Sequence, residues 1–228
     1  MRSQEQINKI KQHISDPYSV EHFVSEEDIV ELISIYNQGS KTVKNTGPVT
    51  LDIKDYLDLP VFQRLLAGIK TEIGEFEVTA GLFFKTDYPH IIHNDDTFEL
   101  PDAVYKAITI PLYADGNGIP KLCFFDQFYF HGPAKFFNGS NDIPTYYNQQ
   151  VYDYSKIDGR VDNVFIDKHK YFTHLKPSWL TGLSLHSALD WIPTQAIIFD
   201  SVRLHCASDF RSLGIKSKLG LSIFTKSL

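Results

Sequence analysis

His93 and Asp95 have side chains that bind metals, and they lie two positions apart in HIIHNDDTFEL (90–100). In an extended chain, residues i and i+2 point to the same side, so the imidazole and the carboxylate can reach one point. They would supply two of the three ligands in the 2-His-1-carboxylate facial triad that holds non-haem iron. A chain with nine histidines contains such a pair easily by chance, so the alternative is a strand-end histidine beside a solvated aspartate.

The third ligand has to come from a distant part of the chain, and we expect His205 to supply it. AIIFDSVRLH (196–205) begins with the apolar residues of a buried strand, turns at DSV and places His205 on the next strand. Lys216 and Lys218 follow where the last strand is predicted to open, and strand alternation puts both on one face. An ammonium group near the metal would offset the cost of burying a carboxylate in a barrel.

The residues beside these ligands are predicted to have other roles. Alternation favours Asp95 over Asp96 as the ligand and leaves Asp96 solvated or in a capping role. His90 is three residues before His93, which predicts the opposite face and a place at the surface or packed behind the ligands. Cys206 should point away from the metal as a buried structural thiol.

The composition is that of an ordinary globular protein. The chain has 228 residues, of which 43% are hydrophobic and 22% charged, which predicts one domain with a sizeable core. A net charge of −6 disfavours a nucleic-acid partner. The sequence has neither a secretory leader nor an apolar run long enough for a membrane helix, and its two cysteines cannot form a disulfide framework. We therefore expect a cytoplasmic protein with no membrane partner.

Apolar periodicity predicts helices in the first 74 residues, near 7–14, 25–37 and 60–74. Ser25 is a candidate N-cap, with Asp28 three residues later as in a capping box. Pro60 suits a first helical position, and Gly74 is a natural stop.

After residue 74 the pattern changes to short strands, at 75–84, 105–113, 121–130, 196–200, 202–207 and 218–225. The turn signal ADGNG (114–118) separates the second of these from the third, as in a hairpin. Strands without intervening helices predict an antiparallel sandwich or barrel. The aromatic and polar stretch 129–180 fits neither pattern, and we interpret it as an insert that forms either a satellite core or a substrate lid. The prediction is one domain, 1–228, with a helical part at 1–74 and a β-rich core at 75–228.

In this order, the leading helices, the His-x-Asp pair, the AIIFDSVRLH segment and the later basic residue resemble the Fe(II)/2-oxoglutarate-dependent dioxygenases. The resemblance covers most of the chain. It implies a double-stranded β-helix, the cupin-like jelly roll, in which His93, Asp95 and His205 bind Fe(II). It also implies that Lys216 or Lys218 binds the distal carboxylate of 2-oxoglutarate. The implied reaction uses O2 to oxidise, most simply to hydroxylate, an organic substrate and releases succinate and CO2, with ascorbate as a supporting reductant.

The basic residue departs from the pattern of many family members, which have arginine at the place of Lys216. Lysine makes a point-charge contact rather than a two-pronged one. The offset from His205 favours Lys216, Lys218 stays open, and Arg211 in the preceding turn is a third candidate.

Two other functions remain open at this stage. One is a cupin-type metal-dependent isomerase or lyase, which would not need a lysine after His205. The other is a non-catalytic jelly-roll module that binds sugars and needs no iron. Neither the substrate, a small molecule or a peptidyl group, nor the oligomeric state follows from the sequence, because selectivity in such folds depends on loops.

Overall fold

A computed structural model describes residues 2–43, 48–96, 105–136, 156–160 and 170–228. The predicted insert at 129–180 is therefore described only in part, and its segments 137–155 and 161–169 lie outside the described residues. Within the part of the chain that is described, no helix is both long and apolar enough to cross a membrane.

The described chain contains three α-helices, short 3₁₀ turns and ten strands. The helices are α1 (Gln4–Lys11), α2 (Glu26–Gln38) and α3 (Pro60–Ile73), and the 3₁₀ turns are η1 (Lys54–Tyr56), η3 (Pro177–Leu180) and η4 (Phe210–Leu213). The strands are β1 (Tyr18–Val20), β2 (Val49–Asp52), β3 (Phe76–Thr86), β4 (Lys106–Ala114), β5 (Lys121–Tyr129), β6 (Ile157–Asp158), β7 (Leu185–Asp190), β8 (Ala196–Asp200), β9 (Arg203–Ala207) and β10 (Lys218–Ser227).

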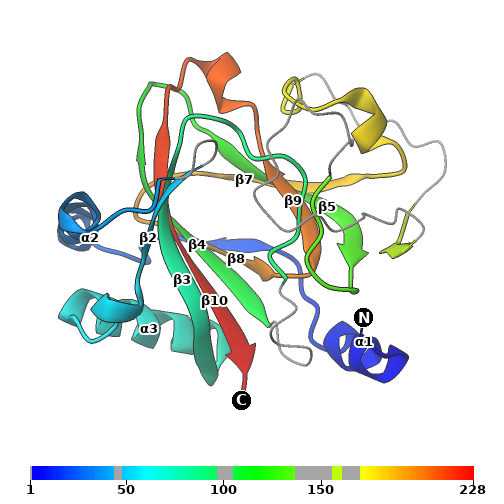
Figure 1. The fold of residues 1–228 in the computed structure, drawn as a ribbon, viewed down its shortest axis with the longest axis horizontal. Helices are drawn as coiled ribbons and strands as arrows, with labels where there is room; N and C mark the ends of the chain where they lie inside the picture. The colour runs from blue at the N-terminus through cyan, green and yellow to red at the C-terminus, as the bar shows by residue number, and fades with distance from the viewer. Residues whose placement is uncertain (1, 44–47, 97–104, 137–155, 161–169) are drawn as a thin grey trace.

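The strands form two antiparallel sheets that face each other across a common interior (Figure 1). The larger sheet has the order β1-β8-β4-β10-β3-β2. In the smaller sheet, β5 is the central strand and pairs with β6, β7 and β9. This architecture is the double-stranded β-helix that the sequence predicts.

Alternation along β10 shows how the larger sheet separates its two faces. Leu219, Leu221 and Ile223 point outward into the apolar cluster that α2 and α3 cover. Lys218 and the residues that alternate with this apolar set therefore face the interior.

The helix ends follow the predicted signals, since the Ser25 hydroxyl accepts the Asp28 N–H and Gly74 ends α3 with a positive φ of 80°.

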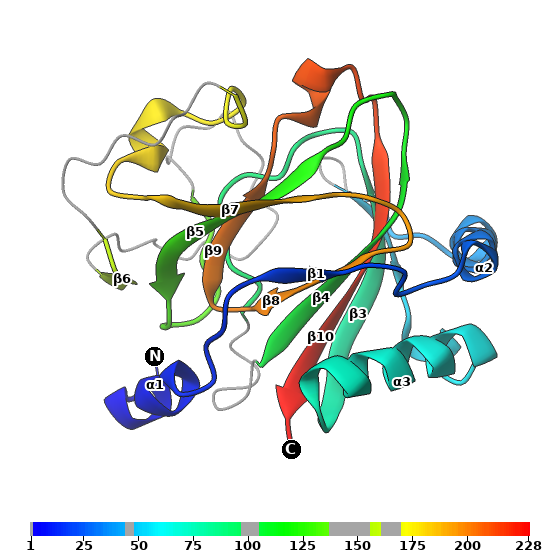
Figure 2. The same ribbon diagram turned by 180° about the vertical axis from the view of Figure 1, so that it is seen from behind.

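Two predictions about the chain's organisation are wrong. The first 74 residues are not purely helical, because β1 and β2 form the two opposite edges of the larger sheet (β2 in Figure 1, β1 in Figure 2). The turn signal ADGNG does not close a hairpin either, because β4 pairs with β8 and β10 whereas β5 lies in the other sheet. Both differences are long-range pairings, which local sequence patterns cannot specify.

The described part of the insert packs into an apolar cluster, as the satellite-core interpretation expects, and the described residues do not test the lid interpretation. Phe172, Leu175 and Trp179 pack with Phe125 and Cys206 in an apolar cluster of their own. His205, the neighbour of Cys206, lies instead against Phe124 and Phe199, two residues of the cluster between the sheets. Cys206 thus belongs to the opposite face of β9 and is fully buried, as predicted.

Candidate metal centre

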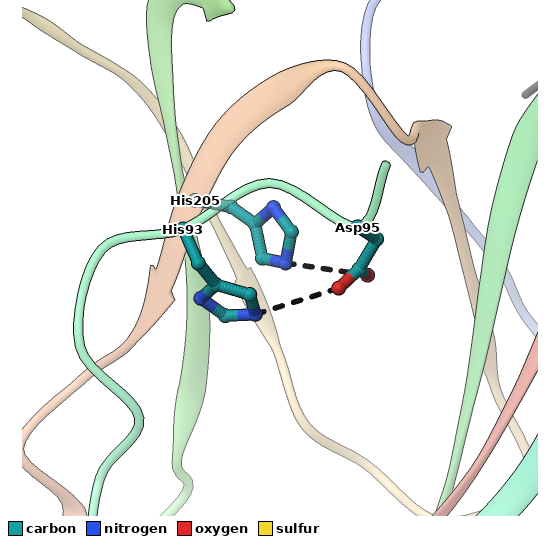
Figure 3. Close-up of side chains that lie close together, drawn as sticks. All are labelled: His93, Asp95 and His205. Carbon is teal, nitrogen blue, oxygen red and sulfur yellow. Dashed lines mark ion pairs between the residues drawn. The ribbon is translucent and has the colours of Figure 1, made fainter. Parts of the chain in front are cut away.

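The structure brings His93, Asp95 and His205 together (Figure 3). Their ligand atoms all lie within 4.8 Å of one another, although the two histidines are 112 positions apart in sequence. The Asp95 carboxylate faces both rings from one side, with Oδ1 3.5 Å from Nε2 of His93 and Oδ2 3.4 Å from Nε2 of His205 (Figure 3).

Backbone pairing explains why these side chains meet. His93 and His205 form an antiparallel bridge, in which each N–H donates to the other's carbonyl oxygen at 2.9 Å. Directly paired residues project to the same face, and the two ring centroids are 4.2 Å apart. The Asp95 N–H donates to the Ser201 carbonyl at 2.8 Å, in the turn between β8 and β9. The segment that carries the His-x-Asp pair is thus fixed at His93 by β9 and at Asp95 by the β8–β9 turn.

Hydrogen bonds define which ring nitrogen of each histidine is available. Nδ1 of His93 lies 2.7 Å from the Ile91 carbonyl oxygen, and Nδ1 of His205 lies 3.0 Å from the Arg203 carbonyl oxygen. A carbonyl can only accept, so each Nδ1 carries the proton and donates it. Each Nε2 then directs a lone pair toward Asp95, which is the tautomer that a metal ligand needs.

The charges of the three groups also suit a metal. Burial alone would raise the pKa of Asp95, but His205 and His93, when protonated, attract and hydrogen-bond the carboxylate strongly enough to outweigh burial and hold this pKa well below its usual range. Burial lowers the pKa of His93, and the adjacent His205 lowers it further. A neutral imidazole and an ionised carboxylate are the forms that bind a divalent cation. Two nitrogens and a carboxylate that all offer lone pairs to one point repel one another unless a cation or a proton lies between them.

The segment around Asp95 is held from its opposite face, and here the prediction for Asp96 is wrong. Asp96 is not solvated: it is 7% exposed and forms a buried ion pair with Arg2. Asn94 is also buried, and its amide nitrogen donates to the carbonyl oxygens of Tyr129 and Gly132, both at 3.0 Å. His93 and Asp95 thus face the candidate metal site, whereas the alternate residues Asn94 and Asp96 anchor the segment on its other side.

His90 also lies elsewhere than predicted. Its ring centroid is 4.3 Å from that of His93, so the two rings are neighbours rather than on opposite faces. Residues 90–92 are not part of a regular strand, and alternation therefore does not apply to them. Lys135 Nζ lies 3.4 Å from Nε2 of His90. Of the two places predicted for His90, at the surface or packed behind the candidate ligands, the structure shows the second, because the His90 ring packs against the His93 ring.

The two candidate lysines differ sharply in their surroundings. β10 begins at Lys218, not at Lys216, and Lys216 is exposed in the preceding turn. The expectation that both lysines open the strand on one face is wrong for this reason. Arg211 is exposed in η4 and lies over the ring of Tyr88. Of the three candidates, Lys218 alone extends into the interior, where it is 3% exposed.

Lys218 is a buried cation without a carboxylate partner. Its Nζ lies 3.8 Å from the centroid of the Trp191 ring, and the structure shows it no hydrogen bond or ion pair with any described residue. Burial lowers the pKa of Lys218 to about 7. Lys106, which is also buried, differs because its ammonium is paired with Asp200. A buried, unpaired ammonium in a barrel interior is a place for an anion.

Two residues that the sequence analysis missed lie on the same interior surface. Ser187 is paired with Phe124, which is also paired with His205, so the three share the inner face of the smaller sheet. The Ser187 hydroxyl and the Trp191 indole N–H are buried without a hydrogen-bond partner among the described residues. Such groups are costly unless a ligand or water satisfies them. The local sequence LHSALDW (185–191) does not alternate regularly between polar and apolar residues, so it gave no clear signal for either residue.

Comparisons with known proteins agree with this fold. No protein-family model matches the chain, and no curated protein is similar to it in sequence. Among solved structures, the chain is similar to the non-heme alpha ketoglutarate dependent epimerase SnoN from nogalamycin biosynthesis, with 10% identity, a TM-score of 0.55, and coverage of 98% of this chain and 83% of SnoN. The carbocyclase SnoK of the same biosynthesis matches with 10% identity, a TM-score of 0.55, and coverage of 99% of this chain and 84% of SnoK. HygX from Streptomyces hygroscopicus matches with 10% identity, a TM-score of 0.50, and coverage of 99% of this chain and 87% of HygX. The chain therefore has the double-stranded β-helix fold of 2-oxoglutarate- and iron-dependent enzymes.

Proposed function

We propose that this protein is an Fe(II)- and 2-oxoglutarate-dependent oxygenase that oxidises, most simply by hydroxylation, an organic substrate. The observation that carries the proposal is the convergence of His93 Nε2, His205 Nε2 and the Asp95 carboxylate on one point. This donor set is the facial triad of non-haem iron oxygenases. SnoN was solved with Fe3+ and alpha ketoglutarate, another name for 2-oxoglutarate, and HygX with nickel and 2-oxoglutarate.

Lys218 supports the choice of an anionic cosubstrate. Its ammonium lies in the same interior that the inner face of the smaller sheet lines, and the described residues offer it no acid. A dicarboxylate could chelate the metal at one end and pair with Lys218 at the other. The unpartnered Trp191 N–H and Ser187 hydroxyl offer further hydrogen bonds in that interior. A metal-dependent isomerase or lyase has no need of this buried charge.

The mechanism assigns a simple task to each of these residues. When bound, Fe(II) would supply the redox chemistry that couples decarboxylation of 2-oxoglutarate by O2 to oxidation of the substrate. His93 and His205 hold the metal through Nε2, and their Nδ1–H bonds to backbone carbonyls keep the rings oriented. Asp95 supplies the one negative charge of the ligand set. Phe124 and Phe199, which contact the His205 ring, exclude water from its side of the site.

The experiment is a turnover assay with Fe(II), ascorbate and O2. Wild-type protein should convert 2-oxoglutarate to succinate and CO2, slowly without substrate and faster when a screened compound is accepted. Product analysis by mass spectrometry should include epimerised and cyclised compounds as well as hydroxylated ones, because SnoN and SnoK are an epimerase and a carbocyclase.

His205→Ala should abolish succinate release, whereas the control His22→Asn, in an exposed turn with φ of 53°, should leave it unchanged. Turnover of a substrate without consumption of 2-oxoglutarate would favour the isomerase or lyase. Sugar binding that persists in His205→Ala, with no metal bound by the wild type, would favour the binding module.

A further inference from the structure

The N-terminal segment Arg2–Lys11 contacts the segment that carries Asp95, although the two are far apart in the sequence. The Arg2 guanidinium makes a two-pronged ion pair with Asp96, in which Nη2 donates to Oδ1 at 2.7 Å and Nη1 pairs with Oδ2. The side chains are 4% and 0% exposed, respectively. Asp96 directly follows the ligand Asp95, so the pair is formed one residue from the metal site.

Arg2 also contacts the loop that holds the other side of the ligand. Nη1 of Arg2 donates to the Phe130 carbonyl oxygen at 3.1 Å. The neighbouring carbonyls of Tyr129 and Gly132 accept from the amide of Asn94, the residue before Asp95. The two residues that flank Asp95 are therefore anchored to one loop, Asn94 directly and Asp96 through Arg2.

α1 adds a third contact, with the β8–β9 turn that accepts the Asp95 N–H. The helix begins right after Arg2 with a capping box between Ser3 and Gln6. Ile7 of α1 packs with Phe130 and Val202. Val202 follows Ser201, whose carbonyl accepts the Asp95 N–H. In both views α1 lies apart from α2 and α3, which cover the larger sheet (Figures 1 and 2).

We infer that the Arg2–Lys11 segment is a positioning element of the metal centre, in which Arg2 fixes the Asp95 carboxylate through Asp96. The inference rests on the proposed function, since it assumes that the triad binds a metal. A carboxylate ligand at the end of an irregular segment can rotate away from its two histidines. A buried, two-pronged ion pair on the next residue removes that freedom, because both planar groups have to keep one orientation.

The sign of the effect separates positioning from simple charge. Arg2 is a cation near the metal site, so its removal by Coulomb's law alone should tighten binding of a divalent ion. Loss of positioning should instead weaken binding, and loss of such an outer contact typically costs about 10- to 100-fold in metal affinity. We therefore expect Arg2→Met to raise the dissociation constant for Co(II) by about 10- to 100-fold.

The test titrates Co(II) into metal-free protein, with the visible absorption of Co(II) as a second readout of its coordination geometry. The variants are Arg2→Met, Asp96→Asn, the double variant, and Arg2→Lys, which keeps the charge but loses the fork and should recover part of the affinity. Arg64→Met is the matched control, because it breaks another arginine–aspartate pair, with Asp28, between α3 and α2. Thermal unfolding of the metal-free proteins shows that each titration is done on folded protein. If Arg2→Met does not fold, Arg2→Lys carries the test, because it keeps the charge and a loss of affinity then reports the lost fork. Asp96→Asn shows only whether the pair matters, because removal of its negative charge by itself weakens cation binding.

Each result has one meaning. Weaker Co(II) binding with an altered spectrum in Arg2→Met or Arg2→Lys, and unchanged binding in Arg64→Met, would support the positioning role. Variants that melt at a lower temperature but bind Co(II) as tightly as the wild type, or more tightly, would overturn it and leave a purely structural ion pair. A wild-type protein that binds no Co(II) through His205 would overturn the proposed function itself, and the positioning role with it.

Discussion

Replacing Lys218 by methionine should stabilise the ligand-free protein and at the same time weaken 2-oxoglutarate binding. The two effects have one cause. Without ligand, the ammonium is buried against Trp191 with no acid among its described neighbours. With ligand, the same ammonium would neutralise a buried carboxylate.

The size of the first effect follows from the pKa of Lys218. Burial lowers this pKa from 10.5 to about 7. At 1.36 kcal/mol per pH unit, the upper bound on the cost to the free energy of unfolding is about 5 kcal/mol. Replacing buried charges by apolar residues of similar volume gains about 1–4 kcal/mol in practice, and we expect Lys218→Met to fall in that range.

The stabilisation should depend on pH in a defined direction. Between pH 7 and 10.5 the unfolded chain binds a proton at Lys218 that the folded protein does not, so wild-type stability rises with pH across this window. The advantage of Lys218→Met should therefore be largest at and below pH 7 and fade toward pH 10.5. The second effect has the opposite sign. A bound carboxylate that loses its buried partner costs about 3–5 kcal/mol, which is roughly a 10²- to 10⁴-fold weaker affinity for 2-oxoglutarate.

Two assays measure these effects. Denaturant unfolding of the metal-free proteins at several pH values gives the free energy of unfolding, and calorimetric titration of 2-oxoglutarate into Ni(II)-loaded protein gives the affinity. Lys216→Met is the matched control, because the exposed Lys216 should change stability by less than about 0.5 kcal/mol and leave the affinity unaltered. If Lys216→Met lost the affinity and Lys218→Met kept it, the assignment of Lys218 would be wrong.

Three further predictions concern the same interior and its support. Binding of 2-oxoglutarate above pH 7 should take up a proton at Lys218, because a bound carboxylate raises the pKa of the ammonium from about 7; calorimetry in buffers of different ionisation enthalpy would detect it, and equal heats after buffer correction would contradict it. Gly220→Ala should destabilise the protein by about 1–3 kcal/mol, because a Cβ would lie 2.7 Å from the Trp191 ring, and a denaturation midpoint like that of the wild type would refute this close approach. Asn94→Leu should also cost about 1–3 kcal/mol, since it leaves buried backbone groups of the 129–134 loop unpaired, and unchanged hydrogen-exchange protection in that loop would argue against the anchoring role.

The grouping of His93, Asp95 and His205 was accessible to sequence reasoning because much of it depends on local rules. Alternation puts His93 and Asp95 on one side of an extended segment, and the strand–turn–strand pattern before His205 is short and unambiguous. The helix ends at Ser25 and Gly74 likewise follow from capping chemistry within a few residues. These features require no knowledge of what packs against them.

The errors concern features that depend on distant partners. Asp96 looked solvated because the residue that neutralises it, Arg2, lies 94 positions away. Lys216 looked better placed than Lys218 because the start of β10 is set by its pairing with Thr86 and Ala114, not by its own sequence. Ser187 was missed because only its pairing with Phe124 shows that it faces the interior.

The central claim is that one iron ion binds to two histidines and an aspartate. The most direct measurement is anomalous diffraction at the iron absorption edge from crystals grown without oxygen in the presence of Fe(II). We predict one strong peak, bonded to Nε2 of His93, Nε2 of His205 and a carboxylate oxygen of Asp95. An Fe(II)-saturated crystal with no peak among these three atoms, or with its iron bound elsewhere, would contradict the account.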